Sequence, residues 1–270
     1  MINLTIKKVI LWIVSFYILT IIGIYTLQRY IIFQPVELPL DYQFVFENPY
    51  DEFFIKTKDN ETLNALLFQT DLPCKGLVIY FHGNADNLQR WGKFHSDFTS
   101  RGYDVFMSDF RGFGKSTGQP DELKLYDDAQ LVYDFIFDLV DKYKRSKVII
   151  YGRSLGCAIA SNLATKVEAQ KIILETPFKN FSNLMKTNSR ILFLPFDFKY
   201  YFSNDEHLSK IKKPIYIFVG TKDWIVPNQS SNQLKPLLKP SDQYIEIEGG
   251  GHKNLNTFNN SARIIYKNFK

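Results

Sequence analysis

Six short runs dominated by apolar residues, separated by longer segments with helical spacing, constrain the fold of this chain most strongly. The runs lie at residues 76–81, 103–107, 148–151, 171–174, 215–219 and 244–247, and the helical patterns at 87–100, 122–142, 155–166, 228–238 and 254–269. Apolar runs of this length are typical of strands buried on both faces of a sheet. Their alternation with helices predicts an α/β fold with a mostly parallel, doubly wound sheet, whose ligands bind at the carboxyl ends of the strands.

The segment before these runs predicts antiparallel strands. Alternating apolar residues occur at 44–46 and 53–56, and the turn Asp59-Asn60-Glu61 leads into a further apolar segment at 62–68. A turn between two such segments favours a hairpin. We therefore expect a sheet of about eight strands within one domain at residues 34–270, with a small cap insertion at about 179–212.

The N-terminal segment is apolar enough to cross a membrane. Residues 9–27 contain no charged side chain, and Lys7, Lys8 and Arg29 flank them. A helix of this length is about 28 Å long and matches the roughly 30 Å hydrocarbon core of a bilayer. A secretory signal peptide would normally be shorter and end at a small-x-small cleavage site, which residues 24–27 lack. We expect an uncleaved single-pass anchor within residues 1–33, and the charge difference across it favours a globular domain on the non-cytoplasmic side.

Composition excludes several classes of function. The chain has 270 residues, of which 45% are apolar, and a formal net charge of +5 with acidic and basic residues mixed along the sequence. Because no basic segment is interleaved with aromatic residues, we expect no nucleic-acid binding. Cys74 and Cys157 are the only cysteines and make neither a disulfide framework nor a zinc site. We expect no metal and no cofactor.

The pentapeptide from Gly152 to Gly156 lies between a predicted strand and a predicted helix and places Ser154 at a turn. This Gly-x-Ser-x-Gly pattern in a strand–turn–helix setting is typical of a nucleophile elbow. Such a turn forces the serine into a strained backbone region, and the two glycines leave space for it. The sequence therefore predicts Ser154 as nucleophile and the backbone N–H of Leu155 as an oxyanion donor.

Two later strand ends carry candidates for an acid and a base. Asp223 follows one apolar run, and His252 follows the last run through three glycines. A carboxylate can orient a histidine ring, and the histidine can accept the serine proton. The chain order Ser154, Asp223, His252 is the order expected after a nucleophile elbow of this type. Glu175, also at a strand end, is an alternative acid.

The first long apolar run ends at His82-Gly83-Asn84. In an acyl-transfer enzyme the loop at this place supplies a second oxyanion N–H, which here would come from Asn84. Gly83 allows the loop to approach a substrate closely, and we expect His82 to orient the loop rather than to take part in the chemistry. A further strand end carries Asp109, for which Arg111 is the expected salt-bridge partner in a rigid turn.

In combination these motifs resemble the α/β-hydrolase superfamily, and more narrowly its membrane-anchored bud-emergence-type branch, which is related to the α/β-hydrolase-domain protein depalmitoylases. The resemblance rests on His82-Gly83-Asn84-Ala85-Asp86-Asn87, Asp109-Phe110-Arg111-Gly112-Phe113-Gly114-Lys115-Ser116, Gly152-Arg153-Ser154-Leu155-Gly156, Gly220-Thr221-Lys222-Asp223 and Gly251-His252. It covers about residues 44–270 together with the N-terminal anchor. The depalmitoylases share a palmitoylated, cysteine-rich N-terminus, whereas this chain has an apolar span without cysteine.

The resemblance implies a serine hydrolase in which each predicted site residue has a role. Ser154 would be the nucleophile, Asp223 the acid and His252 the base, and the N–H groups of Asn84 and Leu155 would form the oxyanion hole. We expect hydrolysis of a carboxylic ester or thioester through an acyl-enzyme. The substrate would be a small-molecule or lipid-like acyl ester or an acylated protein.

Large apolar residues crowd the predicted cap and are suited to line an acyl-binding pocket, with ordinary core packing as the alternative for each of them. They are Phe181, Leu184, Met185, Ile191, Leu192, Phe193, Leu194, Phe196, Phe198, Tyr200, Tyr201 and Phe202. Acyl transfer, peptide cleavage and a non-catalytic, membrane-tethered binding module are the alternative functions.

Overall fold

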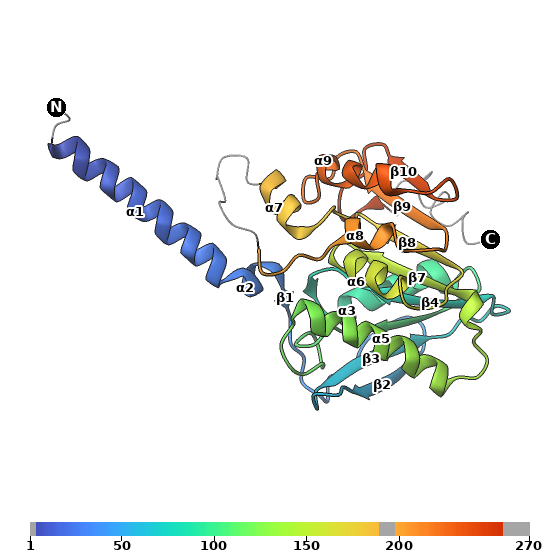
Figure 1. The fold of residues 1–270 in the computed structure, drawn as a ribbon. Helices are drawn as coiled ribbons and strands as arrows, with labels where there is room; N and C mark the ends of the chain where they lie inside the picture. Colours follow the sequence, from blue (N-terminus) through green and yellow to red (C-terminus); the bar gives the residue numbers. More distant parts are fainter. Residues whose placement is uncertain (1–3, 189–197, 256–270) are drawn as a thin grey trace.

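A central sheet of eight strands organises the molecule. The computed structural model describes residues 4–188 and 198–255 (Figure 1). In spatial order the strands are β10 (Gln243–Ile247), β9 (Ile215–Gly220), β8 (Lys171–Glu175), β7 (Val148–Arg153), β4 (Gly76–Phe81), β6 (Tyr103–Ser108), β3 (Thr62–Phe68) and β2 (Asp51–Lys56). Neighbours from β10 to β6 pair in parallel, and β3 and β2 add antiparallel strands at one edge. The predicted, mostly parallel sheet is confirmed.

Helices cover both faces of this sheet. They are α3 (Leu88–Trp91), η1 (Gly92–His95), α4 (Ser96–Thr99), α5 (Glu122–Leu139), η2 (Arg145–Lys147), α6 (Leu155–Ala164), α7 (Phe181–Asn188), α8 (Asn204–Leu208), α9 (Asn228–Ser231) and η3 (Asn232–Leu237). Val132 of α5 and Ile159 of α6 share a core cluster with Ile79, whereas Phe98 of α4 shares another with Val78. Because successive strand residues point to opposite faces, β4 contributes to both clusters.

Residues 44–46, which the sequence predicts as a strand, form no strand in the structure. The backbone of Val45 is bonded to a side chain instead. Its N–H donates to Gln89 Oε1 (2.9 Å), and Gln89 Nε2 donates to its carbonyl (3.0 Å). Phe44 and Phe46 stack on each other with centroids 6.0 Å apart, and both contact Tyr50. The apolar alternation therefore belongs to an aromatic cluster and not to the sheet.

The predicted helix at 87–100 is broken into three short pieces, α3, η1 and α4. The first of the two breaks falls at Gly92, where a Cβ atom would lie 2.5 Å from the ring of Phe46. The helix predicted at 228–238 likewise ends in the 3-10 helix η3, which contains Pro236. Of the helix predicted at 254–269, residues 256–269 lie outside the described residues.

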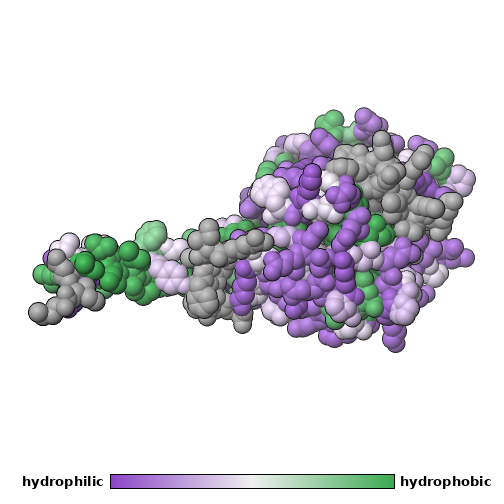
Figure 2. Space-filling model, turned by 90° about the horizontal axis from the view of Figure 1, so that it is seen from above, coloured by the Kyte–Doolittle hydropathy of each residue, from purple (hydrophilic) through white to green (hydrophobic). Residues whose placement is uncertain are grey.

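α1 (Leu4–Thr26) extends away from the globular part of the molecule (Figure 1). None of its residues is buried, its most apolar stretch has a mean hydropathy of 2.2, and apolar residues dominate its surface in Figure 2. A core helix of this composition would be covered by the fold. α1 is therefore a candidate membrane span, and its 23 residues give a length of about 35 Å.

The chain between β8 and β9 contains α7 and α8, within the region predicted as a cap. The predicted cap residues outside the described part of the chain are Ile191, Leu192, Phe193, Leu194 and Phe196. Among the described ones, Phe181 packs edge-on against Phe198 (5.4 Å), and Tyr200 stacks on Phe202 (6.2 Å). Core packing, the alternative to a pocket lining, accounts for these four rings.

Candidate active site

Ser154 lies at the sharp turn between β7 and α6. Its backbone has φ 54° and ψ −116°, a conformation that side chains rarely adopt. The Ser154 N–H donates to the backbone carbonyl of Glu175, the last residue of β8 (2.9 Å). This bond fixes the turn to the neighbouring strand. A Cβ atom at Gly152 would lie 2.5 Å from the carbonyl oxygen of Gly156, and one at Gly156 would lie 2.1 Å from that of Phe81. The strained serine and the requirement for glycine that the sequence predicts are both present.

The structure brings Ser154, His252 and Asp223 together in one chain of hydrogen bonds. His252 Nε2 lies 3.0 Å from Ser154 Oγ, and His252 Nδ1 lies 2.8 Å from Asp223 Oδ2. The other oxygen of Asp223 accepts the N–H groups of Ile225 (2.9 Å) and Val226 (2.8 Å), which fixes the carboxylate. A carboxylate at Nδ1 favours the tautomer protonated there and leaves Nε2 as an acceptor for the serine hydroxyl. This arrangement can deprotonate Ser154 during a nucleophilic attack.

The loop after β4 lies against Ser154. A Cβ atom on Gly83 would be 3.8 Å from the Cβ of Ser154 and 3.1 Å from the indole of Trp91, so little room is left for a side chain. The next residue is Asn84. On the other side of the serine, Leu155 is the first residue of α6, and its N–H therefore has no intrahelical acceptor. Both predicted oxyanion donors belong to segments next to Ser154.

His82, the first residue of this loop, is almost fully buried. Its Nδ1 lies 2.7 Å from the carbonyl oxygen of Gly83, and its Nε2 lies 3.4 Å from Asp109 Oδ1. Its ring stacks on Trp91 with centroids 5.8 Å apart. His82 thus contacts the loop itself at Gly83, the segment after β6 at Asp109, and α3 at Trp91.

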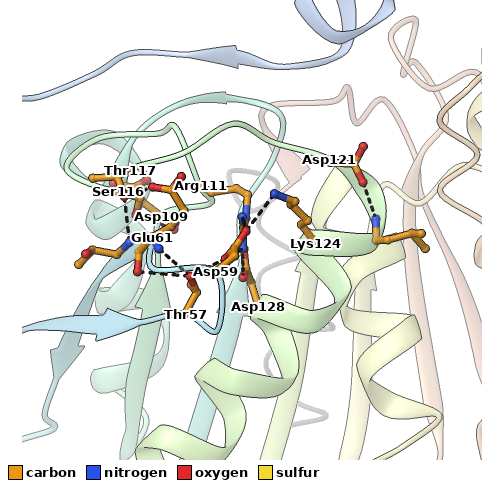
Figure 3. A network of polar contacts seen from close by, with 12 residues as sticks. Thr57, Asp59, Glu61, Asp109, Arg111, Ser116, Thr117, Asp121, Lys124 and Asp128 are labelled. Atoms are coloured by element: carbon orange, nitrogen blue, oxygen red, sulfur yellow. Dashed lines mark hydrogen bonds and ion pairs between the residues drawn. The ribbon is translucent and has the colours of Figure 1, made fainter.

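Arg111 pairs with carboxylates other than the one that the sequence predicts. Its guanidinium donates to Asp128 Oδ1 (2.6 Å) and to Asp59 Oδ2 (2.9 Å), as Figure 3 shows, and this bond lowers the pKa of the Asp59 carboxyl. Asp109 is buried and accepts the Leu88 N–H (3.2 Å). The prediction of an Asp109–Arg111 salt bridge is wrong. The closer partners of the guanidinium are Asp128, on α5, and Asp59, in the turn after β2.

Arg153, the second residue of the elbow pentapeptide, makes a buried contact that the sequence analysis missed. Its guanidinium lies near the rings of Trp91 (5.6 Å) and Phe94 (4.7 Å) and pairs with Glu175 (Nε–Oε1 3.4 Å). Its Nη2 donates to the backbone carbonyl of His252 (3.4 Å). The parallel register of β7 and β8, which sets Arg153 beside Glu175, is the signal that points to this pair. Glu175, the alternative acid, therefore faces an arginine.

Within residues 4–188 and 198–255, no group of three or more His, Cys, Asp or Glu side chains is arranged to hold a metal ion. Cys157 is fully buried, and its thiol donates to the Gly152 carbonyl (3.1 Å). Burial raises the pKa of this thiol well above its ordinary value. Cys157 therefore serves as a small packed residue behind the elbow.

The sheet order, the strained serine after β7 and the side chains that meet it from the ends of β9 and β10 are the features of an α/β-hydrolase. Similarity to known proteins agrees with this geometry: the chain has the α/β-hydrolase fold, and its sequence is similar to those of α/β-hydrolases. Residues 73–197 match the family described as "Serine aminopeptidase, S33".

Proteins with similar sequences include one from a yeast and one from human. Protein bem46 of Schizosaccharomyces pombe is 31% identical over 191 residues, which cover 67% of this chain and 63% of bem46. This chain thus spans slightly less than two thirds of the length of bem46. Alpha/beta hydrolase domain-containing protein 17B of Homo sapiens is 27% identical over 209 residues, which cover 76% of this chain and 70% of that protein.

Among solved structures, the Pyrococcus furiosus esterase Pf2001 has the same fold. It superposes with a TM-score of 0.69 at 19% sequence identity, and the match covers 88% of this chain and 97% of the esterase. At this identity the likeness concerns the arrangement of strands and helices alone.

Proposed function

We propose that this chain is a membrane-anchored serine hydrolase that cleaves carboxylic esters or thioesters. The observation that carries the proposal is the unbroken chain of hydrogen bonds from Asp223 through His252 to Ser154 at the turn after β7. A serine hydroxyl beside a carboxylate-oriented histidine is the arrangement that activates serine for acyl transfer. The proposed reaction uses no cofactor.

In this reaction Ser154 Oγ attacks the acyl carbonyl while its proton passes to His252 Nε2. The side chain of Asp223 is only 2% exposed and stabilises the imidazolium through the bond at Nδ1. The N–H groups of Asn84 and Leu155 donate to the oxyanion, and each such donor contributes about 2.7 to 4 kcal/mol. The imidazolium gives its proton to the leaving alcohol or thiol. Water then attacks the acyl-enzyme by the same route, which releases the acid and restores the serine.

The short connection between α1 and the site supports an acyl or lipid-like substrate. α1 ends at Thr26, and the Gln34 N–H donates to the carbonyl of Asn84, in the loop beside Ser154 (2.9 Å). Eight residues of chain (34 − 26 = 8) span at most about 28 Å, and the helix α2 shortens this distance further. A bilayer that holds α1 therefore keeps the site close to its surface, where lipid-like esters and acylated proteins are concentrated.

For the membrane arrangement, the proposal is a single crossing by α1 with the hydrolase domain on the non-cytoplasmic side. Lys7 and Lys8 precede the apolar span and Arg29 follows it, so the larger positive charge lies on the N-terminal side. Protease added to sealed cells tests this topology. Digestion of the domain from outside supports the proposed side, and protection until the membrane is lysed contradicts it.

Labelling by a fluorophosphonate probe tests the nucleophile. Full-length protein in detergent should react with the probe, and Ser154→Ala should lose labelling and at least about 10⁴-fold of the esterase activity. Ser241→Ala, at an exposed serine, is the matched control and should label normally. Labelling of Ser154→Ala at the wild-type rate would exclude Ser154 as the nucleophile.

A second candidate, peptide hydrolysis, is favoured by the description of the family that residues 73–197 match. Esters and thioesters graded by chain length, assayed beside aminoacyl p-nitroanilides, distinguish the two bond types. Added alcohol or lipid acceptors reveal acyl transfer as a new ester product. Folded protein that neither reacts with the probe nor cleaves any of these compounds would favour the non-catalytic binding module.

A further inference from the structure

Residues 28–38, called the tether below, join α1 to the globular domain and are built into its fold. They contain α2 (Gln28–Ile32) and the short strand β1 (Gln34–Pro35). β1 pairs in parallel with β5 (Ala85–Asp86), the two-residue strand directly after Asn84. Figure 1 shows α2 and β1 between the foot of α1 and the globular domain. The tether is therefore a paired element and not a free linker.

Two hydrogen bonds join the tether to Asn84 itself. The Gln34 N–H donates to the Asn84 carbonyl (2.9 Å), and Asn84 Nδ2 donates to the Ile32 carbonyl (2.7 Å). A third bond, from Asn87 Nδ2 to the Val36 carbonyl (3.0 Å), holds the end of the same loop. The backbone and the side chain of Asn84 are thus both fixed by the tether.

The tether is in turn seated on the region between β8 and β9. Phe33 is 3% exposed and packs edge-on against Tyr200 and Phe202, with ring centroids 5.5 and 5.9 Å apart. The Oε1 of Gln28, itself buried, accepts the Lys199 N–H (2.7 Å). A shift of the tether would break these contacts as well as those to the loop.

The far end of the tether is held by the turn after β6. The Leu38 N–H donates to the Gly114 carbonyl (2.8 Å), and the Gly114 N–H donates to the Val36 carbonyl (3.1 Å). Anchored at both ends, the tether presents a fixed edge to the loop at Asn84.

We propose that the tether is a positioning element of the oxyanion loop, so that the segment that fastens the protein to the membrane also sets the place of the Asn84 N–H. This inference rests on the proposed hydrolase function. The loop follows Gly83, whose backbone is intrinsically free, whereas an oxyanion donor must lie about 2.7 to 3.1 Å from the developing charge. A misplacement of about 1 Å costs on the order of 100-fold in rate. Ile32 and Gln34 act through Asn84 and are positioning residues.

The test removes one backbone N–H from full-length protein in detergent micelles. Gln34→Pro deletes the donor to the Asn84 carbonyl, and Phe33 already has the extended conformation (φ −103°, ψ 124°) that a residue before proline requires. Gln34→Ala changes the same exposed side chain but keeps the N–H, so it is the matched control. Asn84→Ala is a second variant, which keeps the backbone amide and loses the bond to the Ile32 carbonyl.

Three quantities are measured for each protein: the rate of Ser154 phosphonylation by a fluorophosphonate, kcat and KM for a short-chain p-nitrophenyl ester, and Tm. We expect Gln34→Pro and Asn84→Ala to lower kcat and the phosphonylation rate about tenfold or more, with KM and Tm close to wild type. Gln34→Ala should stay within about twofold of wild type. A purely structural role would lower Tm and the number of active sites without changing the rate per active site.

Wild-type protein that reacts with the probe, together with two variants that react equally fast, overturns the inference. A loss in Gln34→Ala as large as in Gln34→Pro overturns it too, because the N–H would then be irrelevant. If Gln34→Pro does not fold, Asn84→Ala decides by its rate per active site. Folded wild-type protein that fails to react at all contradicts the proposed function instead, so the two failures are distinguishable.

Discussion

At the turn after β7, the position of the Ser154 hydroxyl depends on a backbone conformation that residues with a side chain rarely adopt. Ser154 has a positive φ of 54°, and strain of this kind costs on the order of 1–3 kcal/mol. The conformation persists because Gly152 and Gly156 let β7, α6 and the end of β4 pack without intervening side chains. Residues that support this turn therefore affect the reaction rate together with stability.

Arg153 is such a supporting residue. We predict that Arg153→Met lowers the free energy of unfolding by about 3–5 kcal/mol, because the carboxylate of Glu175 would remain buried without its cation. Urea denaturation of the full-length protein measures the loss. The double variant Arg153→Met/Glu175→Gln should recover part of it. Lys235→Met, which breaks an exposed pair with Glu246, is the control and should cost less than about 1 kcal/mol. Equal losses at the buried and exposed pairs would refute this account.

The buried side chain of His207 should make the free energy of unfolding depend on pH. Its ring nitrogens lie 3.0 Å from Ser161 Oγ and 3.1 Å from Asn162 Nδ2. Burial, with smaller contributions from Lys210 and Lys166, lowers the pKa of His207 to about 4. The unfolded chain binds this proton near pH 6.5, so the folded state holds fewer protons between these values. The free energy of unfolding should therefore fall by up to about 3 kcal/mol as the pH drops from about 6.5 to about 4.

The measurement compares unfolding of wild type and His207→Gln across pH 4 to 8. The variant keeps a polar side chain that cannot titrate in this range, so carboxylate titrations common to both proteins cancel in the difference. We expect the two curves to differ in slope below about pH 6.5 and to run parallel above it. Parallel curves throughout would show that His207 carries no such linkage.

At the scale of elements, α6 can pack closely against β4 only because residue 156 is a glycine, which has no side chain. A Cβ atom at Gly156 would lie 2.1 Å from the carbonyl oxygen of Phe81 and 2.5 Å from that of His82. We predict that Gly156→Ala displaces α6 and costs at least about 1–3 kcal/mol of stability, with a loss of Ser154 reactivity. Thermal unfolding and fluorophosphonate labelling measure both effects. Gly23→Ala, where nothing lies within 4 Å, should change neither.

Helices and strands whose own residues carry a clear pattern could be predicted from the sequence. β4 and β7 are continuous apolar runs, and Ser154 stands between glycines at the end of one of them, so strand, turn and helix follow from local chemistry. Asp223 and His252 could be assigned to strand ends because parallel strands end on one edge. The distances from His252 to Ser154 and to Asp223 come from the structure, because a local sequence pattern holds no information about them.

Elements that depend on distant partners could not be predicted. Phe44 and Phe46 alternate as in a strand, yet the backbone between them bonds to the Gln89 side chain. The pairing of Gln34 with Ala85 involves two residues on each side, too few to leave a periodic pattern. For the same reason, the bonds from the tether to the loop at Asn84 appear only in three dimensions.

For the whole molecule, the separation between α1 and the globular domain predicts how the protein partitions. Phe16 and Leu19 lie near the middle of α1 and are 74% and 67% exposed. An arginine at the centre of a membrane helix costs roughly 2.5–3.5 kcal/mol on insertion scales. We predict that wild type stays with membranes after alkaline carbonate extraction and that Phe16→Arg/Leu19→Arg is released. Leu4→Arg, at the helix end, is the control and should remain bound; release of wild type would argue against α1 as an anchor.

The bond between Gln28 and Lys199 joins residues 171 positions apart in the chain. At a synthesis rate of about 5 to 20 residues per second, the ribosome makes the second residue roughly 9 to 34 seconds after the first. During that interval α1 is already available to the membrane, while the aromatic side chains that will cover Phe33 have not yet been made. The apolar ring of Phe33 at the base of α1 therefore reaches its buried position only after synthesis has passed Phe202.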